Sequence, residues 1–275
     1  SFHKARIQDL RLDLEAAGAW LAEHPIRTVE DLEAFDAHCD ALRTQAPLVA
    51  DDSVDVIVSN CVLNLVRPEE KERLFTEMAR VLRRGGRAVI SDIVCDEDPT
   101  PQILADPALW SGCIAGAYRE DAFLDAFAKA GFYGIEIVSR AAEPWQVIDG
   151  IEFRSVTVRA FHGKEGPCLE RNQAVIYGGP WSQVQDDDGH VLKRGERTAV
   201  CDKTYRILTD RRGPYGDDVL PVPPRVEVPL DRAAPFACRD GRARSPRETK
   251  GEDYHETREG EGASSCSPGA GGCCE

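Results

Sequence analysis

The stretch Val54–Ile93 reads VDVIVSNCVLNLVRPEEKERLFTEMARVLRRGGRAVISDI and decides the fold. Its first apolar run predicts a strand covered on both faces, which ends at Ser59-Asn60-Cys61. Pro68 then opens an amphipathic helix at its tolerated first turn, with apolar residues three and four positions apart. Gly85-Gly86 ends the helix, and Arg87–Ile93 returns as a second apolar strand. The pattern is a strand-helix-strand unit, which favours an α/β fold.

This stretch resembles the passage between the fourth and fifth strands of class I S-adenosylmethionine-dependent methyltransferases. Three further passages, Ser59–Leu65, Asp106–Ala117 and Gly166–Tyr177, resemble arsenite methyltransferases in particular. The resemblance covers about Phe2 to Thr209. It implies a partial Rossmann-like, doubly wound α/β sheet followed by a small β-rich module. The implied activity is transfer of a methyl group from S-adenosyl-L-methionine to thiolate-bound trivalent arsenic.

The chain begins with Ser1, at the place where a methyltransferase of this class leaves its third strand. The resemblance places a glycine-rich cofactor loop and a further arsenic-binding thiol upstream of that point. We therefore expect this chain to be a fragment without the N-terminal part, inactive by itself.

The resemblance implies that Cys113 and Cys168 are the catalytic residues and the arsenic ligands. Trivalent arsenic is a soft centre that prefers thiolate sulfur among the protein side chains. Its lone pair can attack a sulfonium methyl in line if the protein supplies proximity and orientation. No general base is needed, because arsenic carries no proton. The alternative for Cys113 is a buried cysteine that packs as a small hydrophobic residue.

Five residues are candidates for cofactor binding by the same resemblance. Ile7 and Gln8 correspond to a dipeptide that contacts adenine, and Ser59, Asn60 and Cys61 line the cofactor cleft. Cys61 sits at a strand end, where open α/β sheets bind ligands, although core packing explains it as well.

Composition excludes some partners. The net charge of −14 argues against nucleic acid, and no apolar run reaches the ~20 residues that span a bilayer. Ten cysteines without a C-x-x-C pair indicate soft ligands or redox groups in a cytoplasmic enzyme. The expected partners are a small-molecule substrate, arsenite or its thiol conjugates, and a thiol reductant such as thioredoxin or glutathione.

The chain divides into three predicted parts. Residues 1–162 form the C-terminal portion of the methyltransferase domain, with a helical insertion over 7–46, and residues 163–212 form the small module. The apolar spacing from Ile7 to Leu21 predicts the first helix of the insertion, and Thr28 with Asp31 predicts a capping box at the start of the second. Residues 213–275 are expected to be a largely disordered tail, rich in proline, glycine and charge, with a cysteine-rich end. That end captures metalloid and passes it inward, reduces a disulfide formed in turnover, or is an untethered flexible terminus without a chemical role.

Two local patterns in the small module have competing interpretations. We favour a structural role over ligation for Cys201. The run Asp186–His190 predicts a turn rather than a calcium loop, because it lacks the spaced oxygen ligands of such a loop.

Two alternative functions stay open. One is a generic small-molecule methyltransferase whose cysteines are merely buried. The other is a non-catalytic, thiol-rich metalloid-binding protein. Arsenite titration of cysteine variants tests the first, and cofactor binding by the complete protein tests the second.

Overall fold

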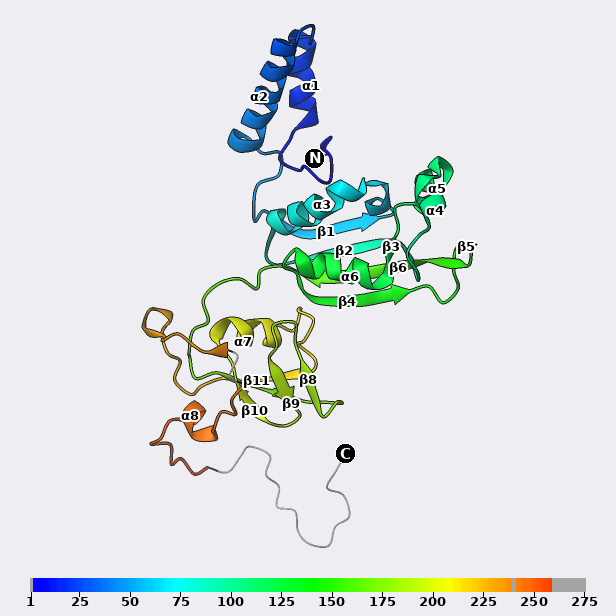
Figure 1. Cartoon of the computed structure of the whole chain (residues 1–275). Helices are drawn as coiled ribbons and strands as arrows, with labels where there is room; N and C mark the ends of the chain where they lie inside the picture. Colours follow the sequence, from blue (N-terminus) through cyan, green and yellow to red (C-terminus); the bar gives the residue numbers. More distant parts are fainter. Residues whose placement is uncertain (1, 239–240, 259–275) are drawn as a thin grey trace.

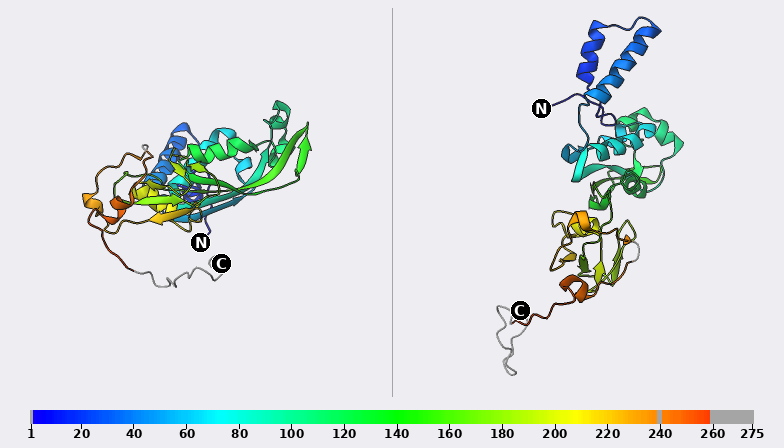
Figure 2. Two further views of the ribbon diagram at one scale, coloured as in Figure 1. Left: turned by 90° about the horizontal axis from the view of Figure 1, so that it is seen from below. Right: turned by 90° about the vertical axis from the view of Figure 1, so that its left-hand side faces the viewer.

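The fold is taken from a computed structural model, which describes residues 2–238 and 241–258. Figures 1 and 2 show three parts in a row: a helical hairpin, an α/β domain built on one sheet, and a small β-rich module. In the described ranges, no helix is both long enough and apolar enough to cross a membrane.

The hairpin consists of α1 (Leu14–Glu23) and α2 (Val29–Gln45). The predicted capping box at the start of α2 is present, since the side chain of Thr28 and the carboxylate of Asp31 bond reciprocally to backbone amides. The first helix begins later than its apolar spacing suggested. Asp13 accepts bonds from two amides of the first turn and so starts α1 at residue 14.

The central sheet is mixed, and the predicted α/β class is confirmed. The strand order is β1-β2-β6-β4, with β3 beside β2 and β5 beside β6. β1 runs parallel to β2, whereas β6 is antiparallel to both β2 and β4. The strands are β1 (Val54–Asn60), β2 (Leu82–Cys95), β3 (Tyr118–Arg119), β4 (Tyr133–Arg140), β5 (Gln146–Ile148) and β6 (Ile151–Phe161).

Two helices cover one face of this sheet and form its main core. They are α3 (Pro68–Val81), which joins β1 to β2 as predicted, and α6 (Glu120–Lys129). The predicted end of the first of these helices is wrong, because α3 ends at Val81 and Gly85-Gly86 lie inside β2. Met78 of α3 and Phe127 of α6 are fully buried against Ile90 and Val158 of the sheet. Burial of each such side chain contributes roughly 1.5–3 kcal/mol, so the core holds both helices to the sheet.

The prediction that the first strand is covered on both faces differs from the structure. Val58 of β1 is 74% exposed and Val56 is 38% exposed. The reason is topological: β1 is an edge strand, and within the described residues α3 and α6 cover only one face. An apolar run indicates that a strand is buried, but it does not show which elements cover each of its faces.

Three short segments follow β1 and β2 at the carboxyl edge of the sheet. They are the 3-10 helix η1 (Leu63–Leu65) and the single-turn helices α4 (Pro101–Ala105) and α5 (Pro107–Ser111). α4 and α5 pack against the β2–β6 end of the sheet through a second cluster of buried residues that includes Ile103, Ile114 and Phe153, whereas Leu63 of η1 belongs to the main core.

The small module is β-rich, as predicted. Its sheet places β7 (Ala174–Tyr177) between β10 (Arg197–Ala199) and β11 (Val219–Val222), with α7 (Asp202–Thr209) alongside. A hairpin of β8 (Gln183–Gln185) and β9 (Val191–Lys193) completes it. The predicted turn at its tip is confirmed, because Asp186 accepts bonds from the amide and the ring of His190.

The expected tail needs correction over residues 213–258. β11 pairs with β7, and η2 (Leu230–Arg232) and α8 (Pro246–Lys250) follow it. Arg244, 2% exposed, donates two bonds to the carboxylate of Glu170. Composition suggested disorder because charged residues usually stay in water, but here they pair with buried partners. The cysteine-rich end, Cys266, Cys273 and Cys274, lies outside the described residues.

Candidate functional site

Cys61 and Cys113 lie next to each other at the carboxyl edge of the sheet. Cys61 follows β1 directly, and Cys113 lies two residues beyond α5. The thiol of Cys113 donates to the carbonyl oxygen of Cys61 over 3.6 Å. Both residues have left-handed backbone conformations, with φ of 53° and 62°. Such conformations are uncommon for residues other than glycine, and they accumulate at functional sites.

The side chain of Asn64 anchors the loop that carries Cys113 through hydrogen bonds. The side-chain amide of Asn64 donates to the carbonyl oxygens of Ile93 at 2.7 Å and of Cys113 at 2.9 Å. Asp92, 1% exposed, accepts bonds from the amides of Leu63 and Asn64 and so fixes this turn. The backbone at Cys113 is therefore tied to the end of β2 through buried polar contacts.

A second support of the same loop comes from Lys71 of α3. Its ammonium group donates to the carbonyl oxygen of Gly116 and lies 4.3 Å from the ring centroid of Tyr118. Gly116 leaves no room for a side chain, since a Cβ there would lie 1.9 Å from the backbone oxygen of Asn64. The close approach explains the small residues around Cys113.

Burial changes the acidity of this region. Desolvation raises the pKa of Asp92, against the opposing effect of the amide bonds and Lys71. Desolvation lowers the pKa of Lys71 to about 8. It also raises the pKa of Cys61 and Cys113, and the charge of Asp92 adds to both shifts. The two thiols are therefore protonated near neutral pH, and a ligand must displace their protons.

The predicted cofactor residues lie near this edge. Ile7 and Gln8 line an open cavity of about 450 Å³ together with Val62, the neighbour of Cys61. This volume falls in the range of small-molecule sites. Gln8 donates its amide to Glu70 at 3.1 Å, which leaves its oxygen available as an acceptor. The hydroxyl of Ser59 is buried and has no hydrogen-bond partner among the described residues. These features fit an adenosine-type ligand.

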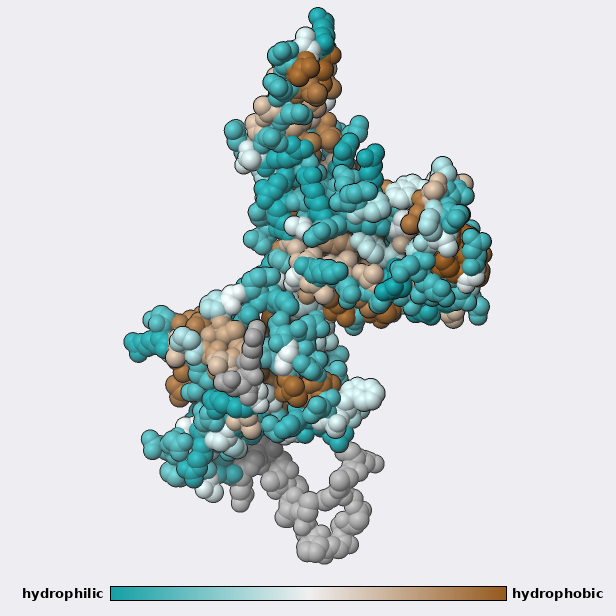
Figure 3. Space-filling view, in the orientation of Figure 1, coloured by the Kyte–Doolittle hydropathy of each residue, from teal (hydrophilic) through white to brown (hydrophobic). Residues whose placement is uncertain are grey.

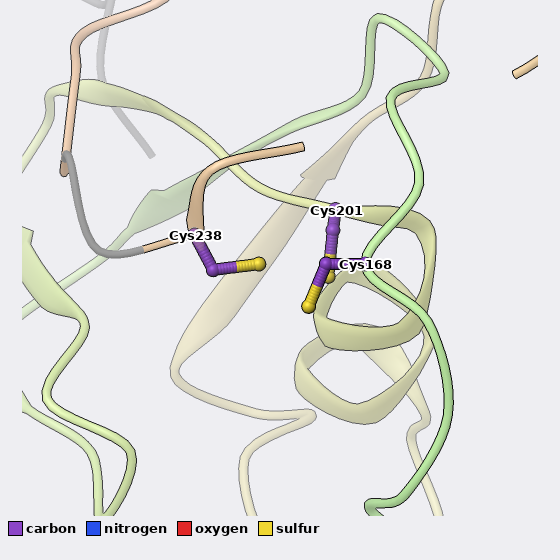
Figure 4. A group of neighbouring side chains, drawn as sticks. All are labelled: Cys168, Cys201 and Cys238. Atoms are coloured by element: carbon purple, nitrogen blue, oxygen red, sulfur yellow. The ribbon is translucent and has the colours of Figure 1, made fainter. Parts of the chain in front are cut away.

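Cys168 belongs to a second group of thiols in the small module. Figure 4 shows its sulfur beside those of Cys201 and Cys238. The three Sγ atoms lie within 4.8 Å of one another, and none of the three is in a disulfide. We call Cys168, Cys201 and Cys238 the thiol trio. Its members come from three separate segments, so only the tertiary structure brings them together.

Cys201 is the buried centre of the trio. It caps the N-terminus of α7, where its sulfur accepts a bond from the amide of Thr204 at 3.4 Å and is hydrogen-bonded with the hydroxyl of Thr204 at 3.2 Å. Burial raises the pKa of Cys201, but the bonds from Thr204, Cys238 and Cys168 outweigh it and the net shift is downward. Burial and its two neighbouring thiols raise the pKa of Cys238. The surrounding hydrogen bonds therefore make Cys201 easier to deprotonate.

The structure thus divides the two predicted arsenic ligands between two groups. Cys113 lies with Cys61 beside α5, whereas Cys168 lies beside α7 in the module, and Figures 1 and 2 show these helices in different parts of the chain. Cys238 was not singled out from the sequence, because it falls in the segment expected to be a tail. Lys71 was missed as well, because a lysine on an amphipathic helix usually faces solvent.

Two family models match the chain. A methyltransferase domain model matches residues 35–140, and a model described as a domain of unknown function matches residues 164–254. The second match agrees with the structure in extending the module beyond residue 212.

Curated relatives carry the name arsenite methyltransferase. The protein from Aquipseudomonas alcaligenes is 32% identical over 178 residues, which cover 60% of this chain and 50% of the relative. The human protein is 32% identical over 193 residues, covering 66% and 50%. The protein from Halobacterium salinarum is 44% identical over 92 residues, covering 34% and 23%. The chain spans about half the length of the first and second of these relatives.

Among solved structures, an arsenic (III) S-adenosylmethionine methyltransferase from Chlamydomonas reinhardtii matches with a TM-score of 0.41 and 23% identity. The match covers 73% of this chain and 77% of that one.

Proposed function

Since the chain is a relative of the arsenite methyltransferases and carries a methyltransferase domain, we propose that its protein methylates trivalent arsenic with S-adenosyl-L-methionine. The observation that supports this most is the thiol of Cys113 beside Cys61 at the carboxyl edge of the sheet. In open α/β sheets this edge is where ligands bind.

Cys113 and Cys168 are the proposed arsenic ligands. In arsenous acid each hydroxide on arsenic can be exchanged for a thiolate, and the thiol proton leaves with the hydroxide as water. The product keeps the arsenic lone pair, which is the nucleophile for methyl transfer. Cys113 suits this role because its backbone is fixed by Asn64 while its thiol is partly exposed. A single arsenic atom bound by both ligands requires the module to approach this edge of the sheet.

The proposed cofactor contacts are Ile7, Gln8, Ser59, Asn60 and Cys61. When bound, S-adenosyl-L-methionine supplies an electrophilic methyl group on a sulfonium sulfur. The cavity beside Ile7 would take the adenosine part, with the amide oxygen of Gln8 as an acceptor. The unpartnered hydroxyl of Ser59 is a further group for the cofactor to satisfy. Asn60 and Cys61 lie at the strand end next to the arsenic site.

A thiol reductant such as thioredoxin or glutathione is the proposed partner. Cys113 and Cys168 ligate arsenic only when their thiols are reduced, and a reductant keeps them so. Such a reaction suits the cytoplasm, where thiols persist. The non-catalytic alternative, a thiol-rich metalloid-binding protein, draws support from the thiol trio alone and predicts binding without methyl transfer.

Methyl transfer by the complete protein tests the proposal. Incubation with arsenite, a thiol reductant and labelled S-adenosyl-L-methionine should give labelled methylarsenic species. Cys113→Ser should lower the rate by roughly a hundredfold or more, because the substrate is no longer held at the edge. Cys39→Ala, which removes a thiol from the helical hairpin, is the matched control and should keep the rate. Absence of labelled product, or a rate unaffected by Cys113→Ser, would refute the proposal.

A further inference from the structure

We infer that the thiol trio, Cys168, Cys201 and Cys238, is a binding site for trivalent arsenic within the small module. The inference rests on the proposed function for the identity of the metalloid. In it, Cys168 binds arsenic with Cys201 and Cys238 in place of Cys113 while the module lies apart from the edge of the sheet. Its evidence is the geometry of the module, and it does not depend on the region around Cys113.

The spacing of the sulfur atoms suits a shared soft ion. Bonds of about 2.3 Å, the length of a zinc–thiolate bond, place two sulfurs of one site roughly 3.5–4 Å apart. The three Sγ atoms already lie within 4.8 Å of one another. Rotation of the cysteine side chains is therefore enough to close the site, and the backbone need not move.

The backbone at the trio is fixed before any ligand binds. The amide of Phe236 donates to the carbonyl oxygen of Cys168 at 2.9 Å, and the amide of Glu170 donates to Ala234 at 2.8 Å. These bonds join the segment before Cys238 to the segment after Cys168. Cys201 is held as the cap of α7. A preformed site binds more tightly because less ordering is required on binding.

The surroundings of the thiol trio allow a ligand to enter, and they leave the charge of the neighbouring Asp202 paired. Cys201 is fully buried, whereas Cys168 and Cys238 are half-buried and open the site to solvent. Asp202, the sequence neighbour of Cys201, is paired with Arg171 at 2.7 Å and with Arg206 at 3.0 Å. A neutral trithiolate complex therefore meets no unpaired charge from this residue.

The number of donors favours trivalent arsenic over zinc. Within the described ranges, the group contains three thiols and no fourth cysteine, histidine or carboxylate. Structural zinc sites are almost always closed by four protein ligands. Trivalent arsenic needs three, because its lone pair occupies the fourth direction. Arsenous acid would exchange three As–O bonds for three As–S bonds, and the three thiol protons would leave in three water molecules, with no change of oxidation state.

Arsenite titration of the 275-residue chain tests this inference. The background variant changes Cys113, Cys266, Cys273 and Cys274 to Ser, so that the trio is the main accessible group of thiols. We expect one arsenic per chain by mass spectrometry, loss of three reactive thiols, and three sulfur neighbours of arsenic by X-ray absorption. Zinc at equal concentration should not displace it.

Cys201→Ser in this background is the decisive variant. Serine is a favoured helix cap, so α7 should keep its start, as circular dichroism can check. Loss of one of three chelating ligands should weaken arsenite binding by roughly a hundredfold. Cys39→Ser, which changes a thiol of the helical hairpin, is the matched control and should leave the affinity unchanged. Arsenic with two sulfur neighbours, or unchanged affinity in both Cys201→Ser and Cys238→Ser, would overturn the inference.

Failure of this site and failure of the proposed function give different results. If the trio does not bind arsenite while the complete protein methylates it, the inference is wrong and the function stands. If the trio binds arsenite while no methyl transfer occurs, the function is wrong and the site stands.

Discussion

The chain holds two groups of cysteines that are built in opposite ways. At the sheet edge, Cys61 and Cys113 have left-handed backbones and reach solvent from loops that buried polar groups support. In the thiol trio, Cys201 is buried at a helix cap, and its partners come from segments far away in the sequence. The first arrangement exposes a thiol at the edge of the sheet. The second gathers three sulfur atoms, where we infer a site for a small ligand.

The surface view fits this division. Figure 3 shows apolar residues over the module and along the lower side of the sheet domain, between largely hydrophilic surfaces of both parts. The two groups lie in parts of the chain with separate hydrophobic clusters. Each group should therefore respond to changes in its own part and not to changes in the other.

The largest effect is expected from Arg244→Ala. Arg244 pairs bidentately with Glu170 and holds the segment after Cys238 against the module. Breaking a buried ion pair by removing one partner costs about 3–5 kcal/mol. Urea unfolding of the module should show this loss, and Cys168 and Cys238 should be alkylated faster while Cys113 is unchanged. Arg242→Ala is the control, since Arg242 is half-exposed and should contribute less than about 1 kcal/mol. Equal losses in both variants would contradict the anchoring role.

Gly116→Ala should affect the sheet edge next most strongly. Its Cβ would lie 1.9 Å from the backbone oxygen of Asn64, so the loop with Cys113 must shift. We expect destabilisation by about 3 kcal/mol and faster alkylation of Cys113, with arsenite binding by the trio preserved. Gly112→Ala is the matched control, because its Cβ would make an ordinary contact at 3.4 Å. A stable Gly116→Ala variant would show that this packing is not needed.

The pH dependence of the free energy of unfolding should reveal the buried amine of Lys71 in the α/β domain. Burial lowers the pKa of Lys71 to about 8, below its ordinary value of 10.5. The unfolded chain then binds more protons between these values, so stability rises with pH across about 8 to 10.5. The free energy of unfolding relative to Lys71→Met should increase by roughly 1–3 kcal/mol over that window. A flat profile for Lys71 would show that its amine is not buried.

The smallest effect is expected at His190 in the module, with the opposite sign. The bond to Asp186 raises the pKa of His190 above its ordinary value of 6.5. Its contribution is therefore complete below pH 6.5 and is lost as pH rises through the folded pKa. His190→Gln should remove about 1.5 kcal/mol at pH 6 and less at pH 8. Equal losses at the two pH values would exclude a charged pair.

Much of the fold follows from local patterns. The run Val54–Ile93 predicted a strand, a helix begun by Pro68 and a returning strand, and all three are present. The cap at Thr28 and the turn at Asp186–His190 were also readable from neighbouring residues. The late start of α1 could not be predicted in this way. Its apolar spacing begins before residue 14, but Asp13 is the N-cap, so the residues before it lie outside the helix.

The candidate site was only partly predictable. Cys113 and Cys168 were named through passages that resemble one family, and their role as ligands stays a prediction. The supports of Cys113 were not predicted, since nothing in the sequence shows that Asn64 bonds to a loop 49 residues away. Cys238 was not predicted either, because it lies in a segment whose charge and proline content suggested disorder.

The sequence alone determined the chemistry available to this protein: many thiols, an α/β pattern and a methyltransferase-like passage. Tertiary structure decided which thiols meet, because chain folding joins Cys168, Cys201 and Cys238 over separations that no local periodicity records. Local rules depend on neighbours a few residues apart. A ligand site depends on distances in space, and these are set by packing.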